Sequence, residues 1–254
     1  LGFPGILPVV NKEAIKKALT VATALNCETP EYMIFDRKNY YYPDLPKGYQ
    51  ITQMHYPVGT NGYLDIYVED QVKRIYIHDT HLEEDTASLD HYDGYSLIDY
   101  NRCGVPLLET VTEPCMHSID EALSFLESLK RLFLYTDVSD AKTELGQIRC
   151  DVNVSLMKDT DTKLGTRVEM KNINTFNNVK DALEYEIKRQ TEILDNGGKV
   201  VQETRRYDDN LKMNFSMRSK EDAVDYKYFV EPNIPKIKIS DELIQNIKDE
   251  IPML

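Results

Sequence analysis

The sequence predicts an α+β fold in which helices are interleaved with β-hairpins. Several stretches place apolar residues three or four positions apart, which is typical of amphipathic helices. Shorter stretches alternate apolar and polar residues, which is typical of strands with one buried face. A regular alternation of strand and helix, as in a doubly wound parallel sheet, is not visible in the pattern. The mixture therefore favours an α+β arrangement.

The first predicted helix covers residues 12–25. Asn11 precedes it and has a side chain suited to capping a helix N-terminus. Ile15, Leu19 and Ala22 share one face and form an apolar stripe. We expect this face to pack against the core.

A tyrosine-rich segment, residues 35–53, follows and reads FDRKNYYYPDLPKGYQITQ. Pro43, Pro46 and Gly48 predict that most of it is loop. Its mixture of aromatic and basic side chains suits a nucleobase or a nucleic-acid end. A packed surface loop anchored by tyrosines is an equally good interpretation of the pattern alone.

Alternation over residues 62–68, and again over residues 73–78, predicts a hairpin. The run HLEED at residues 81–85 comes soon after it. Taken alone, such an acidic run is typical of a solvated turn. Residues 97–112 are interpreted as strand and turn.

Two longer helices are predicted in the second half of the chain. Ser118 and Glu121 have the spacing of a capping box, which predicts a helix that continues to about Tyr135. A second apolar stripe predicts a helix over residues 178–195, and Gly197 is expected to end it.

Two strand-like segments, residues 147–156 and 166–173, carry the most informative pattern. Each has one apolar and one polar face, because neighbouring side chains on a strand point to opposite sides. The polar faces gather arginines, a lysine, carboxylates and amides, which would suit an anionic ligand held partly through a metal ion. An ordinary solvent-facing sheet surface is the alternative. Short strands at 200–203 and 215–218 and a last helix beginning at Ser240 complete the predicted elements.

Size and composition describe an ordinary globular protein. The 254 residues allow one large domain or two small ones, and 41% of them are hydrophobic while 29% are charged. No apolar run approaches the roughly 20 residues that span a bilayer, and no signal peptide is visible. We therefore expect no membrane association and a cytoplasmic location, with an organellar matrix as the alternative.

The four cysteines are widely spaced and form no CxxC pair. We therefore expect no zinc site within this segment and reduced thiols in a cytosol-like compartment. Cys150 alternates with aliphatic residues, which indicates a core thiol rather than a nucleophile.

The net charge of −13 opposes nucleic-acid binding unless a local basic patch or a further segment compensates for it. Carboxylates are also the ligands that magnesium requires. Composition alone does not distinguish a metal site from a solvated acidic surface.

The groups that could carry chemistry stand on separate segments. The sequence has no Walker A loop, no GxGxxG, no Gly-x-Ser-x-Gly elbow and no His-x-x-x-His. A nucleotide would therefore need metal-bridged carboxylates together with Arg or Lys. The side chains available for this are His81, Glu83, Glu84, Asp85, Glu109, Glu113, Arg149, Asp151, Glu169, Lys171, Arg205 and Arg206.

Eight stretches, in order along nearly the whole chain, carry a resemblance to a known family. They are LGFPGILPVVNKEAI (1–15), FDRKNYYYPDLPKGYQI (35–51), HLEED (81–85), NRCGVPLLETVTEP (101–114), IRCDVNVS (148–155), GTRVEMKNINTF (165–176), GGKVVQETRRYD (197–208) and MRSKEDAVDYKYF (217–229). The sequence thereby resembles the GatB family, the B subunits of the glutamine-dependent aspartyl/glutamyl-tRNA amidotransferases.

The resemblance implies a fold and a chemistry. The catalytic region of that family resembles the glutamine synthetase and guanido kinase fold, in which antiparallel sheets carry flanking helices. Such a protein binds the acceptor end of Glu-tRNA(Gln) or Asp-tRNA(Asn) and, with ATP and Mg²⁺, phosphorylates the side-chain carboxylate of the attached amino acid. In the heterotrimer, an amidase (the A subunit) supplies ammonia from glutamine to displace the phosphate, and a small protein (the C subunit) clasps the other two.

The resemblance also implies residue roles. The first choices as metal ligands are Glu84 and Glu169, and the second choices are His81, Glu83 and Glu109. The groups expected to face phosphates are Arg149, Lys171, Arg205 and Arg206. The residues expected to bind the aminoacylated substrate are Tyr41, Lys47, Tyr49, Gln50, Asp151 and Asn153.

Compared with the family, residues 1–254 are expected to be one catalytic domain of a longer chain, without an N-terminal strand bearing Glu-x-His and without C-terminal helical and tail domains. Three departures remove an Arg or a Lys: His78-Asp79 stands where members usually have Thr-Arg, Thr86-Ala87-Ser88 where they have Ala-Gly-Lys, and Cys115-Met116-His117 where they have Asp-Met-Arg. Such losses near a phosphate site would weaken nucleotide binding. The alternatives are therefore a catalytically silent tRNA-binding or scaffold paralogue, and a small-molecule amidoligase or kinase of the same fold.

Overall fold

The computed structural model describes residues 5–158, 160–173, 175–219 and 225–252, so part of the MRSKEDAVDYKYF stretch lies outside the described residues. The described helices are α1 (Lys12–Ala24), α2 (Ile119–Tyr135), α3 (Phe176–Asp195) and α4 (Asp241–Glu250), with a 3₁₀ helix η1 (Thr143–Leu145). The described strands are β1 (Tyr32–Met33), β2 (Asp36–Asn39), β3 (Tyr49–Thr52), β4 (Gly59–Val68), β5 (Gln71–Glu84), β6 (Ser88–Tyr92), β7 (Tyr95–Asp99), β8 (Pro106–Thr112), β9 (Cys150–Val154), β10 (Val168–Ile173), β11 (Glu203–Asp208), β12 (Met213–Ser219), β13 (Phe229–Val230) and β14 (Ile237–Lys238).

The helices begin where side-chain caps are available. Asn11 accepts hydrogen bonds from the backbone N–H groups of the first turn of α1, and Ser118 accepts from Glu121 N–H at the start of α2. The predicted starts of these two helices are therefore confirmed. Helix α3 begins two residues earlier than expected, because Thr175 caps it by accepting from Asn178 N–H.

Two main sheets form the body of the protein. The first has the order β4-β5-β8 and is antiparallel throughout. The second has the order β12-β11-β10-β9, and its one parallel pair, β10 with β11, is connected through helix α3. The small sheet β13-β2-β3 brings residues 229–230 beside the start of the tyrosine-rich segment.

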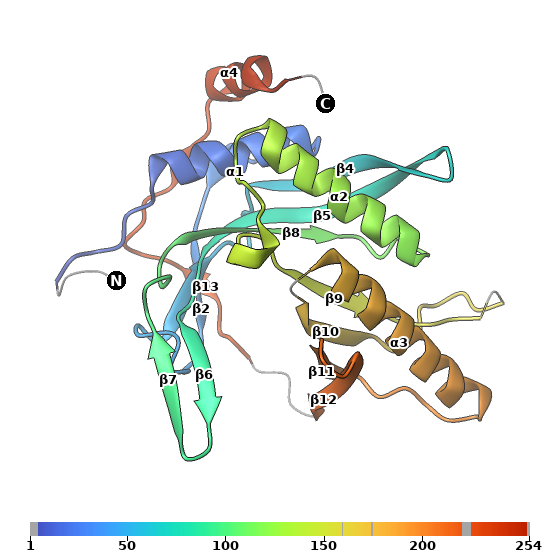
Figure 1. Cartoon of the computed structure of the whole chain (residues 1–254). Coiled ribbons are helices and arrows are strands. Elements are labelled where there is room, and N and C mark those ends of the chain that lie inside the picture. Colours follow the sequence, from blue (N-terminus) through green and yellow to red (C-terminus); the bar gives the residue numbers. More distant parts are fainter. Residues whose placement is uncertain (1–4, 159, 174, 220–224, 253–254) are drawn as a thin grey trace.

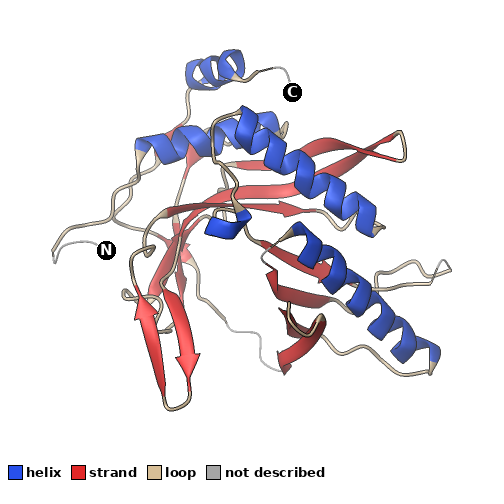
Figure 2. Ribbon diagram, in the orientation of Figure 1, coloured by secondary structure: helices blue, strands red, loops and turns tan. Residues whose placement is uncertain are grey.

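The helices cover one side of each main sheet. Helices α1 and α2 lie over the β4-β5-β8 sheet, and α3 lies against β9, β10 and β12 (Figure 1). Helix α4 packs against α1, and the β6–β7 hairpin projects away from the body (Figure 2). This mixture of helices and mainly antiparallel sheets confirms the α+β prediction, while the likeness to the glutamine synthetase fold stays a prediction.

One hydrophobic core connects the two main sheets. Its buried members include Ile75 and Ile77 of β5, Leu129 of α2, Met170 of β10 and Tyr207 of β11. Cys150 packs against the same core, and burial raises the pKa of its thiol to about 12. The prediction of a core thiol at this position is confirmed in part, because Cys150 packs against the core but is itself only partly buried.

Strand β5 changes its buried face at a β-bulge. Ile77 pairs with Thr112, but Asp79 pairs with Val111. An advance of two residues along β5 therefore corresponds to an advance of one residue along β8, so β5 contains one extra residue at this point. Before the bulge the odd-numbered Ile75 and Ile77 are buried, whereas after it the even-numbered Thr80 and Leu82 are buried. The later odd-numbered side chains of β5 therefore turn to the opposite face of the sheet.

Some sequence expectations need correction. The segment expected to be mostly loop contains β2 and β3, which pair with each other around a shorter loop. The HLEED run is not a separate turn, because β5 continues through Glu84. The strand expected at 200–203 begins only at Glu203. The strand and turn expected at 97–112 correspond to part of β7 and to β8, whereas the pairing of β7 with β6 in a hairpin was not predicted. None of the described helices combines the length and the apolarity that a bilayer span requires.

Candidate functional site

The end of β5 and the middle of β8 bring His81, Glu83 and Glu109 together. One donor atom from each of the three lies within 4.8 Å of the other two. His81 faces Glu109 directly across the antiparallel pair, and Glu83 lies two residues further along the same face of β5. We call these three residues the acidic cluster. It exists because the bulge in β5 turns His81 and Glu83 away from the core.

The electrostatics of the acidic cluster indicate a surplus of negative charge. Burial raises the pKa of Glu83 above its usual value, and the neighbouring Glu109 raises it further. Burial alone would lower the pKa of His81, but the hydrogen bond to Asp79 and the charges of Glu109 and Glu83 raise it overall. A bound cation would relieve this repulsion. Two carboxylates and an imidazole are a donor set that fits a divalent metal ion.

A basic and aromatic group stands beside the acidic cluster, and its members are not among the site residues that the sequence predicts. The Lys38 ammonium lies 4.9 Å from the ring centroid of Tyr226 and 5.9 Å from that of Tyr40. Tyr226 also contacts Tyr228 edge-on, with centroids 6.0 Å apart. Burial first, and then nearby acidic groups that include Glu83, raise the pKa of Tyr40 to about 12. The sequence signals for this group are the mixture of aromatic and basic residues in the tyrosine-rich segment, which contains Lys38 and Tyr40, and the family-like motif that contains Tyr226 and Tyr228.

Glu84 lies apart from the acidic cluster because it follows Glu83 on the strand and points to the other side. Its Oε1 lies 2.5 Å from Lys47 Nζ and accepts a 2.9 Å hydrogen bond from the backbone N–H of Ile51. The buried Gln50 donates to the Glu84 carbonyl oxygen at 2.8 Å. The structure therefore places three predicted site residues, Lys47, Gln50 and Glu84, in one network that joins β3 to β5.

A second polar group covers the face of β9 and β10 that is turned away from α3. Lys171 Nζ lies 3.1 Å from Asp151 Oδ2 and 3.5 Å from Glu169 Oε1. Asn153 is the register partner of Glu169, and the exposed Arg206 is that of Lys171. Burial would lower the pKa of Lys171, but the carboxylates of Asp151 and Glu169 raise it overall. The structure therefore brings these five predicted residues together on one sheet face.

Arg205 lies on the opposite face of β11 from Arg206. Its guanidinium is 2.7 Å from Glu203 Oε1 and 3.5 Å from Glu186 Oε2, and it donates to the carbonyl oxygen of Asn214. The side chain is 11% exposed, and Glu186 is fully buried. The guanidinium therefore lies among ion pairs beneath α3 and away from the face that carries Lys171 and Arg206, and the expected phosphate-facing role of Arg205 stays a prediction.

Arg149 joins the two polar regions. It stands just before β9, and its Nη2 donates to Asp85 Oδ1, at the end of β5, over 3.0 Å. Arg102 donates to the other carboxylate oxygen of Asp85 at 2.8 Å. The predicted phosphate-facing Arg149 is therefore tied to the strand that carries the acidic cluster.

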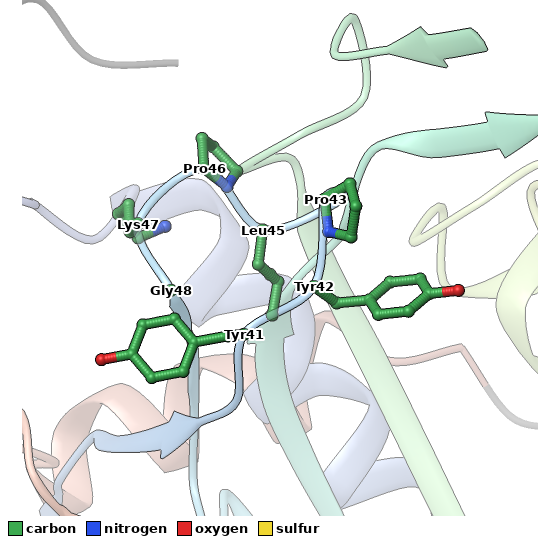
Figure 3. A pocket seen from close by; sticks show the side chains of 7 residues that line it. All are labelled: Tyr41, Tyr42, Pro43, Leu45, Pro46, Lys47 and Gly48. Carbon is green, nitrogen blue, oxygen red and sulfur yellow. The ribbon is translucent and has the colours of Figure 1, made fainter. Parts of the chain in front are cut away.

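The loop between β2 and β3 forms a shallow pocket of about 460 Å³ (Figure 3). It is lined by Tyr41, Tyr42, Pro43, Leu45, Pro46, Lys47 and Gly48. Tyr41 is 94% exposed, and Figure 3 shows its ring pointing away from that of Tyr42. Gly48 has a φ of +74°, and a Cβ there would come within 2.9 Å of the Tyr41 ring. Tyr49 is different from Tyr41, because its ring packs under Arg37 at 4.2 Å.

Comparison with known proteins gives consistent results. The sequence profile of the GatB/GatE catalytic domain family matches residues 1–245. The chain is 51% identical over 256 residues to the B subunit of the aspartyl/glutamyl-tRNA(Asn/Gln) amidotransferase of Brevibacillus brevis, covering 100% of this chain and 54% of that protein. It is 50% identical over 254 residues to the protein of the same name from Persephonella marina, with the same coverage. The chain thus spans about half the length of the curated relatives it matches.

Proposed function

This chain belongs to the GatB/GatE catalytic domain family, and we propose that it is the catalytic part of a tRNA-dependent aspartyl/glutamyl amidotransferase. The similarity over the full chain supports this assignment. The observation that carries the proposed chemistry is the acidic cluster, in which an imidazole and two carboxylates converge within 4.8 Å. The proposed reaction is activation of a side-chain carboxylate with ATP, followed by amide formation.

In this proposal His81, Glu83 and Glu109 hold a divalent ion, which is Mg²⁺ under cellular conditions. When bound, the ion supplies positive charge for the phosphate oxygens of ATP. Glu169, on the neighbouring sheet, is kept as a further candidate ligand. Glu84 is a less favoured candidate metal ligand than the three cluster residues, since its carboxylate already accepts hydrogen bonds from Lys47 and from the backbone N–H of Ile51.

Cationic side chains of the chain are proposed to bind the phosphates. Arg149, Lys171 and Arg206 stand on or beside the β9–β11 face, and Arg149 also reaches Asp85 next to the cluster. Such donors stabilise charge that is spread over a transferring phosphoryl group. Asp151 and Asn153 are proposed to contact the substrate and to orient Lys171.

The proposed reaction has two balanced steps. A carboxylate oxygen of the tRNA-bound glutamate or aspartate attacks the γ-phosphorus of ATP, and the bond to the bridging oxygen breaks to release ADP. Ammonia then attacks the acyl carbon, and inorganic phosphate leaves with the former carboxylate oxygen while nitrogen loses a proton. Phosphorylation is needed because an ionised carboxylate has no good leaving group.

The partners follow from the same proposal. The acceptor end of tRNA is proposed to approach the tyrosine-rich loop, where Tyr41, Lys47, Tyr49 and Gln50 gather around the pocket and β3. The amidase would supply ammonia from glutamine, and the small third protein would complete a heterotrimer. The complex is expected in the cytoplasm or in an organellar matrix.

One assay tests the function. The full-length protein is combined with its amidase and small partner proteins, Glu-tRNA(Gln) or Asp-tRNA(Asn), glutamine and ATP, and ADP and amidated tRNA are measured. Glu109→Gln should abolish both products. Glu113→Gln serves as the matched control because Glu113 lies on the same segment but pairs with His78 instead.

The outcomes separate the alternatives. No amidated tRNA from the wild type, beside an active reference complex, would contradict the proposed function. Retained tRNA binding in that case would support a silent tRNA-binding or scaffold paralogue. ATP consumption with a free amino acid, but not with charged tRNA, would support a small-molecule amidoligase or kinase.

A further inference from the structure

Asp79 lies beside the acidic cluster and contacts only one of its members closely. It stands on β5 two residues before His81, so both side chains project from the same face of the strand. Asp79 Oδ1 and His81 Nδ1 are 2.6 Å apart, a short distance typical of a charge-assisted hydrogen bond. The two side chains are 20% and 15% exposed, which limits competition from water.

This contact decides which ring nitrogen of His81 carries a proton. An ionised carboxylate only accepts hydrogen bonds, so Nδ1 of His81 must be the donor. In the neutral imidazole, Nε2 then holds the lone pair. Nε2 is also the nitrogen that lies 4.0 Å from Glu83 Oε2 and 3.9 Å from Glu109 Oε2. The ring nitrogen that holds the lone pair is therefore the one that lies near the two carboxylates.

We propose that Asp79 is a positioning residue that holds His81 in the Nδ1–H tautomer, so that Nε2 completes a divalent-cation site with Glu83 and Glu109. Metal-binding histidines commonly donate their other N–H to a carboxylate, and this contact fixes the orientation of the ring. The inference rests on the proposed function, which places a divalent ion at the acidic cluster. It specifies which nitrogen of His81 binds the ion and adds a residue that acts through that ligand.

The surroundings of Asp79 offer a matched control. Asp79 Oδ2 lies 3.9 Å from His78 Nε2, and His78 Nδ1 lies 2.7 Å from Glu113 Oε1. Glu113 is thus a second carboxylate in the same neighbourhood, and it is bound to His78 rather than to His81. Glu113→Gln removes the same charge as Asp79→Asn but leaves the Asp79–His81 hydrogen bond in place.

The first measurement is Mn²⁺ binding to the full-length protein by electron paramagnetic resonance, without ATP or tRNA. Asp79→Asn and Asp79→Ala should weaken Mn²⁺ binding about 10- to 100-fold, as expected when the partner of a metal-binding histidine is lost. Glu113→Gln should stay within about fivefold of the wild type, because an exposed charge contributes little.

The second measurement is the ¹⁵N spectrum of the histidine rings in the metal-free protein, with His81 assigned from a His81→Gln variant. Recorded at a pH above the raised pKa of His81, where the ring is neutral, the wild-type spectrum should show a protonated Nδ1 and an unprotonated Nε2 at His81. Asp79→Asn should change this tautomer, because an amide is able to donate to Nδ1 as well as to accept from it. A side chain with a merely structural role would leave the tautomer unchanged.

Each outcome decides the question. Equal Mn²⁺ affinity in the wild type and Asp79→Asn, or an Nε2–H tautomer in the wild type, would overturn the inference and leave the proposed metal site standing. Absence of Mn²⁺ binding by the wild type would overturn both. If the Asp79 variants do not fold, the wild-type tautomer still decides the matter.

Discussion

Arg149 Nη2 lies 3.0 Å from Asp85 Oδ1, and this ion pair connects the start of β9 to the end of β5. The acidic cluster belongs to the first main sheet, whereas Lys171 and Glu169 belong to the second. The Arg149–Asp85 contact is therefore a direct polar link between the two regions that the proposed function combines.

We predict that Arg149→Ala lowers the rate of ADP formation about 10-fold or more, equivalent to about 1.4 kcal/mol of activation free energy. The free energy of unfolding of this variant should differ from that of the wild type by less than about 1 kcal/mol, because Arg149 is half-exposed and Arg102 still pairs with Asp85. Steady-state ADP release and urea unfolding measure the two effects. Arg131→Ala, on the outer side of α2, is the control, and an equal loss of rate in that variant would contradict the prediction.

A second prediction distinguishes Glu83 from its neighbour Glu84. Glu83→Gln should weaken Mn²⁺ binding about 10-fold or more, because it removes a charged oxygen ligand. Glu84→Gln should stay within about threefold, since its carboxylate is bound to Lys47 and Ile51 outside the cluster. Titration followed by electron paramagnetic resonance compares them, and the reverse order would restore Glu84 as the leading metal ligand.

The two adjacent arginines of β11 should behave oppositely. Arg205→Ala should reduce the free energy of unfolding by about 1.5–3 kcal/mol, because the fully buried Glu186 loses one of its two arginine partners and keeps Arg189. Arg206→Ala should change it by less than about 0.5 kcal/mol, as exposed positions usually do. Urea unfolding at neutral pH measures both values. Equal destabilisation by the two substitutions would show that the assignment of faces is wrong.

The buried Glu231 should contribute to stability in a pH-dependent way. Burial alone would raise its pKa, but hydrogen bonds from Arg37 and Asn233 hold it below the usual value of 4.5. A carboxyl group with a lowered pKa stabilises the fold above its unfolded-state pKa, and this contribution is lost as the pH falls through the folded-state pKa.

The wild type should therefore lose stability more steeply than Glu231→Gln when the pH is lowered from about 6 to about 3. Urea unfolding at several pH values gives the two slopes, and Glu192→Gln, on the exposed surface of α3, controls for the loss of one carboxylate. Parallel slopes for the wild type and Glu231→Gln would contradict the assignment.

Helices were the most predictable part of this protein. The apolar stripes before Leu25 and Tyr135 and the caps at Asn11 and Ser118 depend on local spacing, which the sequence displays directly. Strand limits were less predictable, because β2 and β3 depend on pairing with each other and with β13, far along the chain.

The candidate site was predictable as a set of residues but not as a set of contacts. Glu83 and Glu84 are adjacent acids in one motif, and only the strand register shows that Glu83 belongs to the acidic cluster while Glu84 pairs with Lys47. Likewise, Arg205 and Arg206 look alike in sequence, but pairing with Met170 and Lys171 puts them on opposite faces. Asp79 stood out only as part of a departure from the family pattern, and the sequence did not indicate a role beside His81, because that role depends on the distance between the two side chains.

The bulge in β5 makes this strand intolerant of changes in length. Ile77 points to the core and His81 to the acidic cluster only because one extra residue stands between the two parts of the strand. Deleting His78 would exchange the faces of the side chains that follow the bulge. The carboxylates of β5 would then be buried where leucine and threonine now lie. We therefore expect insertions and deletions among related sequences to fall at the tip of the β6–β7 hairpin. The number of residues between Ile77 and His81 should stay fixed, even where the residues themselves change.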